Sequence, residues 1–171
     1  MVIDQRNAGA AVTAPGPILD RWILALSSTG AVSVQQDSTA PAGFTKSAKV
    51  TVTASDTISG TEHVALRQKI EGFNVADLGW GTANAQTVTL SFWVRSSITG
   101  TFGGVFLNSA QNRVYPYTYT ISSANTFEYK TVTIAGDTTG TWLTDNGTGL
   151  DVWFSLGVGS TYSNATTGAW L

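Results

Sequence analysis

Carboxylates in and beside loops are the side chains of this chain best placed to act as a general acid and base. Asp137, Asp145 and Asp151 lie in or near the segments DTTG and TDNG, and Glu71 opens a short segment with helical character. Glycoside hydrolysis needs two carboxyl groups that face each other across a cleft. Asp and Asn more often bond their own backbone in turns, and Asn146 begins an Asn-Gly pair typical of hairpins. We therefore expect turn formation rather than catalysis from these side chains.

The single histidine, His63, follows Glu62 in a segment that alternates like a strand. General-base catalysis requires a positioned partner for the imidazole, and a lone histidine is more often solvated. The chain has no cysteine, no GxSxG elbow, no glycine-rich phosphate loop and no spaced D-x-D-x-D-G calcium loop. The sequence therefore predicts a protein without enzymatic activity, catalytic residues, metal or cofactor.

Aromatic side chains offer a different chemistry, because a planar ring suits both the apolar face of a sugar and a subunit interface. The chain holds 6 Trp, 5 Tyr and 7 Phe. Any one of these rings can instead be covered by a neighbouring segment of its own chain, and this alternative stays open. The interface candidates are Trp93, Trp153 and Trp170, and the glycan-binding candidates are Trp142, Tyr162, Asp145 and Asn146.

Trp93 is carried by the clearest strand of the sequence, residues 87–95, where apolar and polar residues alternate with a period of two. One face of this strand is expected in the core and the other, with Trp93, outside. Alternation predicts further strands over 22–27, 31–36, 48–54, 62–70, 101–107, 115–122, 128–134 and 150–158. Val50 and Val52, and likewise Leu156 and Val158, are expected to point inward, and Asp151 and Trp153 outward.

Other local signals complete this pattern. Gly103 and Gly104 predict a bulge or a close backbone approach, and Pro116 predicts an edge position or a bulge at the start of its strand. Residues 73–80 predict a helical turn, with Asn74 as its cap and Gly79 ending it in the left-handed conformation. No fixed-period repeat argues for a solenoid. We expect an all-β fold, an antiparallel β-sandwich of the jelly-roll type.

Composition sets the remaining bounds. At 171 residues, with 42% hydrophobic and 12% charged residues, the chain predicts an N-terminal arm (1–20) and a single sandwich domain (21–171). A net charge of -2 disfavours nucleic-acid binding. The chain has no apolar run of about 18 residues, so no membrane span is expected. Its first ten residues lack the basic start and apolar block of a secretory signal.

Several segments together resemble a known family. The run IDQRNAGA (3–10) with LDRW (19–22), then QKIEGFNVADLGWGTA (68–83), VTLSFWVRSSITGTFGG (88–104) and YTYTISSANTFEYKTVTIAGDTTGTW (117–142), resembles a jelly-roll domain of tail-fibre-like and other virion-associated bacteriophage proteins. The resemblance covers most of the chain, and the topology it implies is similar to that of carbohydrate-binding modules. Members usually continue past a GAW-like segment to a strand of the GVQLE type. Because this chain stops at Leu171, we expect either a sandwich missing its final strand or one completed by a partner subunit.

The resemblance implies a non-enzymatic structural protein of a virion, in a fibre, a tail appendage or a capsid-surface decoration. Such a protein is made in the host cytoplasm and exposed on the particle, where it acts in assembly, surface display and host attachment. Its expected partners are other virion proteins and copies of itself, as a trimer if it forms a fibre. The alternative is a carbohydrate-binding module that recognises host-surface glycans, and the third hypothesis is a fragment of a glycoside hydrolase.

Overall fold

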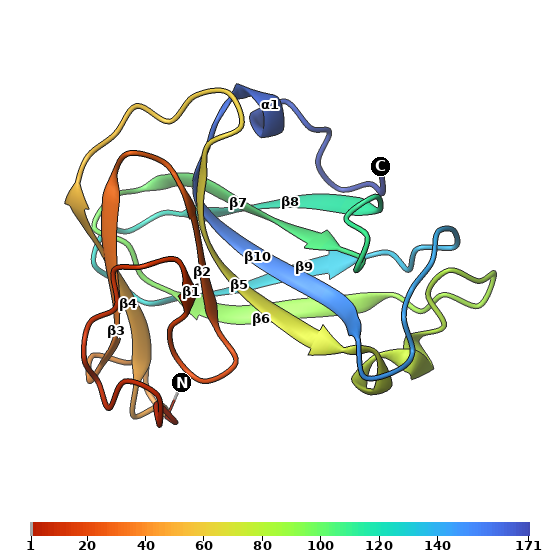
Figure 1. Cartoon of the computed structure of the whole chain (residues 1–171), viewed down its shortest axis with the longest axis horizontal. Coiled ribbons are helices and arrows are strands. Elements are labelled where there is room, and N and C mark those ends of the chain that lie inside the picture. The colour runs from red at the N-terminus through yellow and green to blue at the C-terminus, as the bar shows by residue number, and fades with distance from the viewer. Residues whose placement is uncertain (1) are drawn as a thin grey trace. The chain divides into compact units, whose positions relative to one another are not determined.

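A computed structural model describes residues 2–171, and nearly all of its regular structure is antiparallel β-strand (Figure 1). All nine predicted strands are present. The strands are β1 (Gly16–Pro17), β2 (Ile23–Ser27), β3 (Ala31–Asp37), β4 (Ser47–Ala54), β5 (His63–Glu71), β6 (Val88–Val94), β7 (Gly100–Leu107), β8 (Val114–Ile121), β9 (Glu128–Ile134) and β10 (Thr148–Val158), with the 3-10 helices η1 (Gly72–Asn74) and η2 (Ala76–Leu78) and the short helix α1 (Ser160–Ser163).

The chain forms two compact units. The first contains residues 2–67 and Ser155–Asn164, and the second contains Gln68–Phe154 and Ala165–Leu171. Strands β5 and β10 each begin in one unit and end in the other. In each unit, two antiparallel sheets enclose an apolar core, which confirms the predicted all-β sandwich. The jelly-roll order of the connections, and the division into an arm and one domain at residue 20, stay predictions.

In the first unit, β2 lies between β1 and β5, and β3 pairs with β4. The side chains of these two sheets meet around Leu24, Val34 and Val64, all at most 7% exposed. The segment predicted as an arm packs into this unit. Val12 exchanges backbone hydrogen bonds with Val34 of β3, and the Asn7 amide donates to the carbonyl of Ile18.

Three apolar residues of the first unit were predicted inward and are exposed. Val52 is 68% exposed, and its neighbours from residue 51 to residue 54 at the end of β4 are exposed too, although Val32 opposite it on β3 is buried; the β3–β4 register shifts at this point. Leu156 and Val158 are 44% and 36% exposed. The side chain of Ile58 lies against Gly157, the residue between Leu156 and Val158. The covered side of β10 here is therefore the side of Gly157, and Leu156 and Val158 face away from it.

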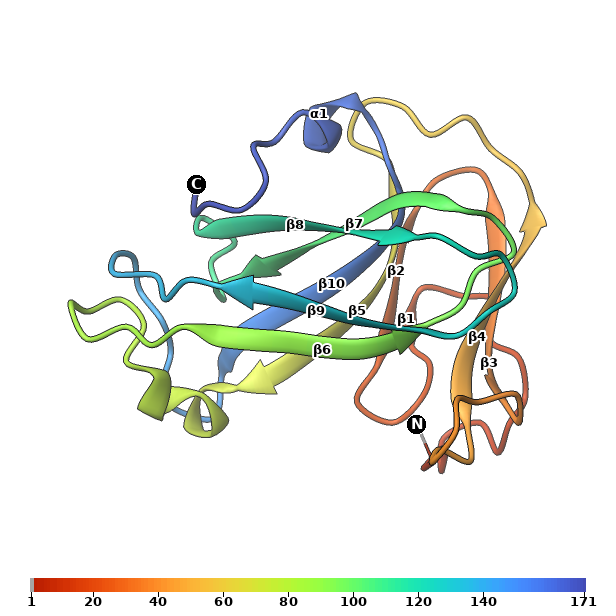
Figure 2. The same ribbon diagram turned by 180° about the vertical axis from the view of Figure 1, so that it is seen from behind.

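In the second unit, β7 pairs with both β8 and β10, and β6 pairs with β9 (Figure 2). Phe92 of β6 joins the two sheets, with ring centroids 4.9 Å from Tyr119 of β8 and 5.0 Å from Phe154 of β10. The alternation predicted for β6 is confirmed: its apolar residues are partly buried and Trp93 is exposed. The first half of β10 is buried on both faces, so Asp151, predicted outward, is only 2% exposed.

The two glycines of β7 mark a close approach rather than a bulge, because the β7–β8 register runs through them without a shift. A Cβ on Gly104 would lie within 3.0 Å of the Trp153 carbonyl oxygen and of the Tyr117 ring. The predicted edge position of Pro116 is also confirmed, since β8 ends the strand order. Residues near the C-terminus cover part of that edge: Gly168 donates to the Pro116 carbonyl, and Leu171 exchanges two backbone bonds with Val114.

The predicted helical turn forms as the two 3-10 helices η1 and η2. Gly79 ends η2 in the left-handed conformation, at φ 61°, as predicted. The prediction of Asn74 as a cap is wrong, because η1 begins after Glu71 and the Asn74 amide donates to the Glu71 carboxylate at 3.1 Å. No helix in the described part of the chain is long and apolar enough to cross a membrane.

Candidate functional site

Asp137, the first of the candidate acids, braces the loop after β9. Its two carboxylate oxygens accept hydrogen bonds from Nε and Nη2 of Arg113 at 2.7 and 2.9 Å, and one of them also accepts from the backbone and hydroxyl of Thr139. The side chain is 2% exposed. Burial raises the pKa of Asp137, but the bonds from Arg113 and Thr139 outweigh it and hold that pKa below its ordinary value. Both oxygens are therefore engaged in a structural ion pair.

The other two candidate aspartates are Asp145, which forms a turn, and Asp151, which is buried in a strand. Asp145 Oδ1 accepts the backbone N–H of Gly147 at 2.8 Å, which is the predicted turn. The same turn accepts backbone bonds from Gly72 and Phe73 of η1, and Asn146 is exposed at its tip. Asp151 lies buried within β10. No cluster of three potential metal ligands exists among residues 2–171.

His63 and Tyr162 belong to the first unit. Their rings meet edge to face at 6.3 Å, and Nδ1 of His63 lies 3.2 Å from the Thr61 carbonyl oxygen. Tyr162 is 51% exposed, whereas the other glycan-binding candidates, Trp142, Asp145 and Asn146, belong to the second unit.

Trp142 and Trp170 are part of an aromatic cluster in the second unit. With Trp80 they make three edge-to-face contacts, at centroid distances of 4.8, 5.3 and 5.3 Å, and Trp170 also packs on Tyr115 at 5.2 Å. Each indole N–H donates to a backbone carbonyl: that of Trp80 to Gln86, that of Trp142 to Thr139 and that of Trp170 to Ala135. The cluster thus uses its polar groups internally and fixes the loops and the C-terminal segment to one another.

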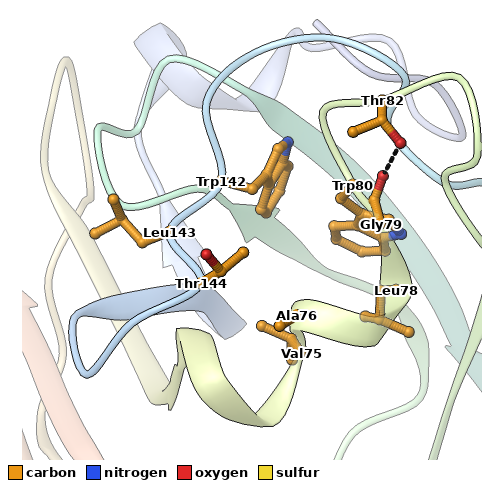
Figure 3. Close-up of a pocket in the computed structure, with 9 residues that line it drawn as sticks. All are labelled: Val75, Ala76, Leu78, Gly79, Trp80, Thr82, Trp142, Leu143 and Thr144. Atoms are coloured by element: carbon orange, nitrogen blue, oxygen red, sulfur yellow. Dashed lines mark hydrogen bonds between the residues drawn. The ribbon is translucent and has the colours of Figure 1, made fainter.

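A small pocket lies beside this cluster (Figure 3). The ring of Trp142 forms one wall, and η2 with Trp80 forms the other. The cavity has a volume of about 140 Å³. Thr82, one of its few polar side chains, donates its hydroxyl proton to the Gly79 carbonyl. The pocket can therefore offer apolar contact and ring stacking to a small group, but few hydrogen bonds. Its lining residues are Val75, Ala76, Leu78, Gly79, Trp80, Thr82, Trp142, Leu143 and Thr144.

Trp93, by contrast, stands on an open surface. The β6–β9 register places Trp93 directly opposite Tyr129, with ring centroids 5.4 Å apart and planes tilted by 51°. The two side chains are 43% and 54% exposed. The same register continues through two pairs of hydroxyl residues, and just beyond the other end of the two strands the Arg95 side chain lies against the Phe127 ring. We call this surface the outer face; it consists of Thr89, Ser91, Trp93, Arg95, Phe127, Tyr129, Thr131 and Thr133.

Arg95 is the one charged side chain of the outer face. Its Nε donates to the Asn125 carbonyl at 2.8 Å, and its guanidinium carbon lies 5.8 Å from the centre of the Phe127 ring. No carboxylate of residues 2–171 lies within ion-pair distance of it, and its terminal nitrogens make no hydrogen bond to those residues. The guanidinium is thus held in place through Nε, and its two terminal nitrogens are available to a ligand.

The three interface candidates therefore differ in their surroundings. Trp93 is exposed on the outer face, Trp170 lies in the aromatic cluster, and Trp153 is partly buried in β10, where its carbonyl accepts the Tyr117 hydroxyl at 2.8 Å. Sequence reasoning placed Arg95 on the outward side of its strand without a role, and it missed Tyr129 and Phe127. The alternation of 128–134 places Tyr129 on the outward side, but only the register of two strands far apart in sequence brings it to Trp93.

Comparisons of this chain with protein-family models, with curated proteins and with solved structures find no match.

Proposed function

We propose that this chain is a non-enzymatic structural protein of a bacteriophage virion, part of a fibre, a tail appendage or a capsid-surface decoration. The observation that carries the proposal is the outer face: a flat, exposed strand surface with two large aromatic rings at its centre and a single charge. A ring left half exposed keeps apolar area that a partner can cover, and burying such a side chain stabilises a contact by about 1.5–3 kcal/mol. The surface is suited to contact and display.

The placement of the charged groups supports a structural role. The side chain of Asp137 is bound by Arg113, and Glu128 accepts bonds from Lys130 and from the backbone of Ser122 and Ser123. In both cases a carboxylate fixes a loop to its neighbour. Such bonds hold the β-sandwich rigid, and they leave these acids without a free oxygen pair for proton transfer.

The virion assignment rests on the family resemblance of the segments quoted above. A host-cytoplasmic origin, other virion proteins as partners and a homo-oligomeric state, a trimer in a fibre, belong to the same proposal. A chain rich in Thr, Ser and Gly and free of cysteine suits a part that is made in a reducing compartment and works outside it.

Quantitative mass spectrometry of purified particles tests this function. We expect the chain at a fixed copy number per particle, in a multiple that matches the symmetry of its attachment site. Analytical ultracentrifugation of the purified chain should show an oligomer at high concentration. A chain that is absent from particles and monomeric at every concentration would contradict the proposal.

The second candidate is a carbohydrate-binding module, and the pocket beside Trp142 favours it. A partly exposed indole ring borders a cavity that can take a small group. Titration with neutral sugars should then change the tryptophan fluorescence, and Trp142→Ala should abolish that change. Unchanged fluorescence throughout such titrations and no signal on a glycan array would exclude this candidate.

A further inference from the structure

The outer face brings together aromatic rings, a guanidinium and hydroxyl groups. Trp93 and Tyr129 give two exposed rings, Arg95 gives an open guanidinium, and rows of Ser and Thr give hydroxyl groups. Rings stack on the apolar faces of sugars, hydroxyls exchange hydrogen bonds with sugar hydroxyls, and a guanidinium binds a carboxylate through two parallel bonds.

The order of these groups suits a sugar that carries a carboxylate. Trp93 pairs with Tyr129 near one end of β6 and β9, and just beyond that end the Arg95 guanidinium lies against the Phe127 ring. A uronate ring over Trp93 and Tyr129 therefore has a guanidinium close by for its carboxylate. The next sugar along the strand meets Ser91 and Thr131.

The same groups argue against a second copy of this chain as the occupant. Two outer faces packed on each other would cover both Arg95 guanidinium groups without giving either a counter-charge, because the face carries one cation and no carboxylate. Removing a charge from water without a counter-charge costs several kcal/mol per ion. Nucleic acid is disfavoured as well, because the chain has a net charge of -2.

From this geometry we infer that the outer face of β6 and β9 binds a polysaccharide that contains uronate residues. The inference rests on the proposed function, because it supplies the host-surface ligand that a displayed virion protein contacts. The carboxylate is bound by the terminal nitrogens of Arg95, the pyranose ring stacks on Trp93 and Tyr129, and the hydroxyl rows bind the chain of sugars on either side.

Isothermal titration calorimetry with uronate oligosaccharides tests the inference. The probes are oligogalacturonate, oligoglucuronate and oligomannuronate, and the matched ligand is methyl-esterified oligogalacturonate, which keeps the ring and loses the charge. We expect at least one of the three uronates to bind. If oligogalacturonate binds, its methyl ester should bind about tenfold or more weakly. A ligand whose ester binds equally well would overturn carboxylate recognition.

Two variants locate the site. Arg95→Gln should weaken uronate binding about tenfold or more and should make acid and ester bind alike. Trp93→Ser should weaken the binding of the acid and of its ester by about the same factor, because it removes ring stacking and leaves the charge of Arg95 in place. The matched controls are Arg6→Gln, which removes another exposed arginine, and Phe44→Ser, which removes another exposed ring (55% exposed), both in the first unit. Equal loss in the controls would overturn the assignment to the outer face.

The remaining outcomes separate this inference from the proposed function. Absence of binding to all three uronates would overturn the inference, and so would equal binding of an oligouridylate, which would indicate anion binding without sugar recognition. An oligomer that Trp93→Ser dissociates would make a second copy the occupant. In each of these cases the copy number in particles still decides the virion role. Conversely, uronate binding that depends on Arg95, in a chain absent from particles, would support the site and remove the virion role.

Discussion

Replacing Gly104 by alanine should destabilise the second unit far more than the same change at its neighbour Gly103. A Cβ on Gly104 would come within 3.0 Å of three atoms, the carbonyl oxygen of Trp153 and two atoms of the Tyr117 side chain. The Tyr117 hydroxyl donates to that same carbonyl at 2.8 Å. A single methyl group therefore displaces a buried ring and breaks a buried hydrogen bond at once.

The cost follows from these two effects. Overpacking a filled core costs about 1–3 kcal/mol. A buried carbonyl left without its donor costs about 1–3 kcal/mol more. Together they lower the free energy of unfolding by about 4 kcal/mol, a large part of the stability of a small protein. At Gly103 the added Cβ lies 3.1 Å from the Tyr117 carbonyl oxygen, so a shift of a few tenths of an ångström accommodates it, at about 1 kcal/mol.

Equilibrium unfolding in urea, followed by tryptophan fluorescence, measures both variants against the parent chain. Tyr117→Phe is a useful third variant, because it removes the hydrogen bond and keeps the ring. It should cost about 1–3 kcal/mol. Free energies of unfolding for Gly104→Ala and Gly103→Ala that agree within the error of the extrapolation to water would refute the reasoning.

Four further predictions concern other groups of the second unit. Asp137→Ala should lower the free energy of unfolding by about 3–5 kcal/mol, because it leaves Arg113 without its counter-charge, and a urea titration measures this. In the parent chain the lowered pKa of Asp137 stabilises the fold above pH 3.8, its ordinary value, and this part should be lost as the pH falls through the folded pKa; an acid titration without a transition below pH 3.8 would contradict it. Burial raises the pKa of Tyr119 to about 12 and that of Tyr117 further. The stability that the two neutral tyrosines contribute should be complete below pH 10 and lost as the pH rises through their pKa values in the folded chain. Absorbance of the tyrosinate form measures this titration. Trp170→Ala should cost about 3 kcal/mol and reduce the near-ultraviolet circular dichroism of the tryptophan cluster, because two of its three ring contacts are lost; an unchanged spectrum would count against the cluster.

Local sequence patterns predicted the strands well because alternation reports which backbone face is buried. Residues 87–95 show this best, since each residue from Val88 to Val94 has the predicted relative exposure. The same reasoning failed at Leu156 and Val158. There the strand leaves one compact unit for the other, and Gly157, which has no side chain, carries the covered face.

The outer face lay beyond sequence reasoning for a different reason. Trp93 alone is a common kind of exposed ring. Its meaning changes when Tyr129 lies opposite it, and the register of β6 on β9 brings that ring there. The same limit applies to Trp170, whose neighbours Trp80 and Trp142 come from two separate loops.

Antibody labelling of intact particles tests the central claim most directly. Antibodies are selected for binding to the parent chain and for loss of binding to Trp93→Ser, so that they report on the outer face. The account predicts that they label intact particles and that soluble parent chain competes the label away. Labelling only after the particles are disrupted, or none at all, would contradict the claim that this surface is displayed on a virion.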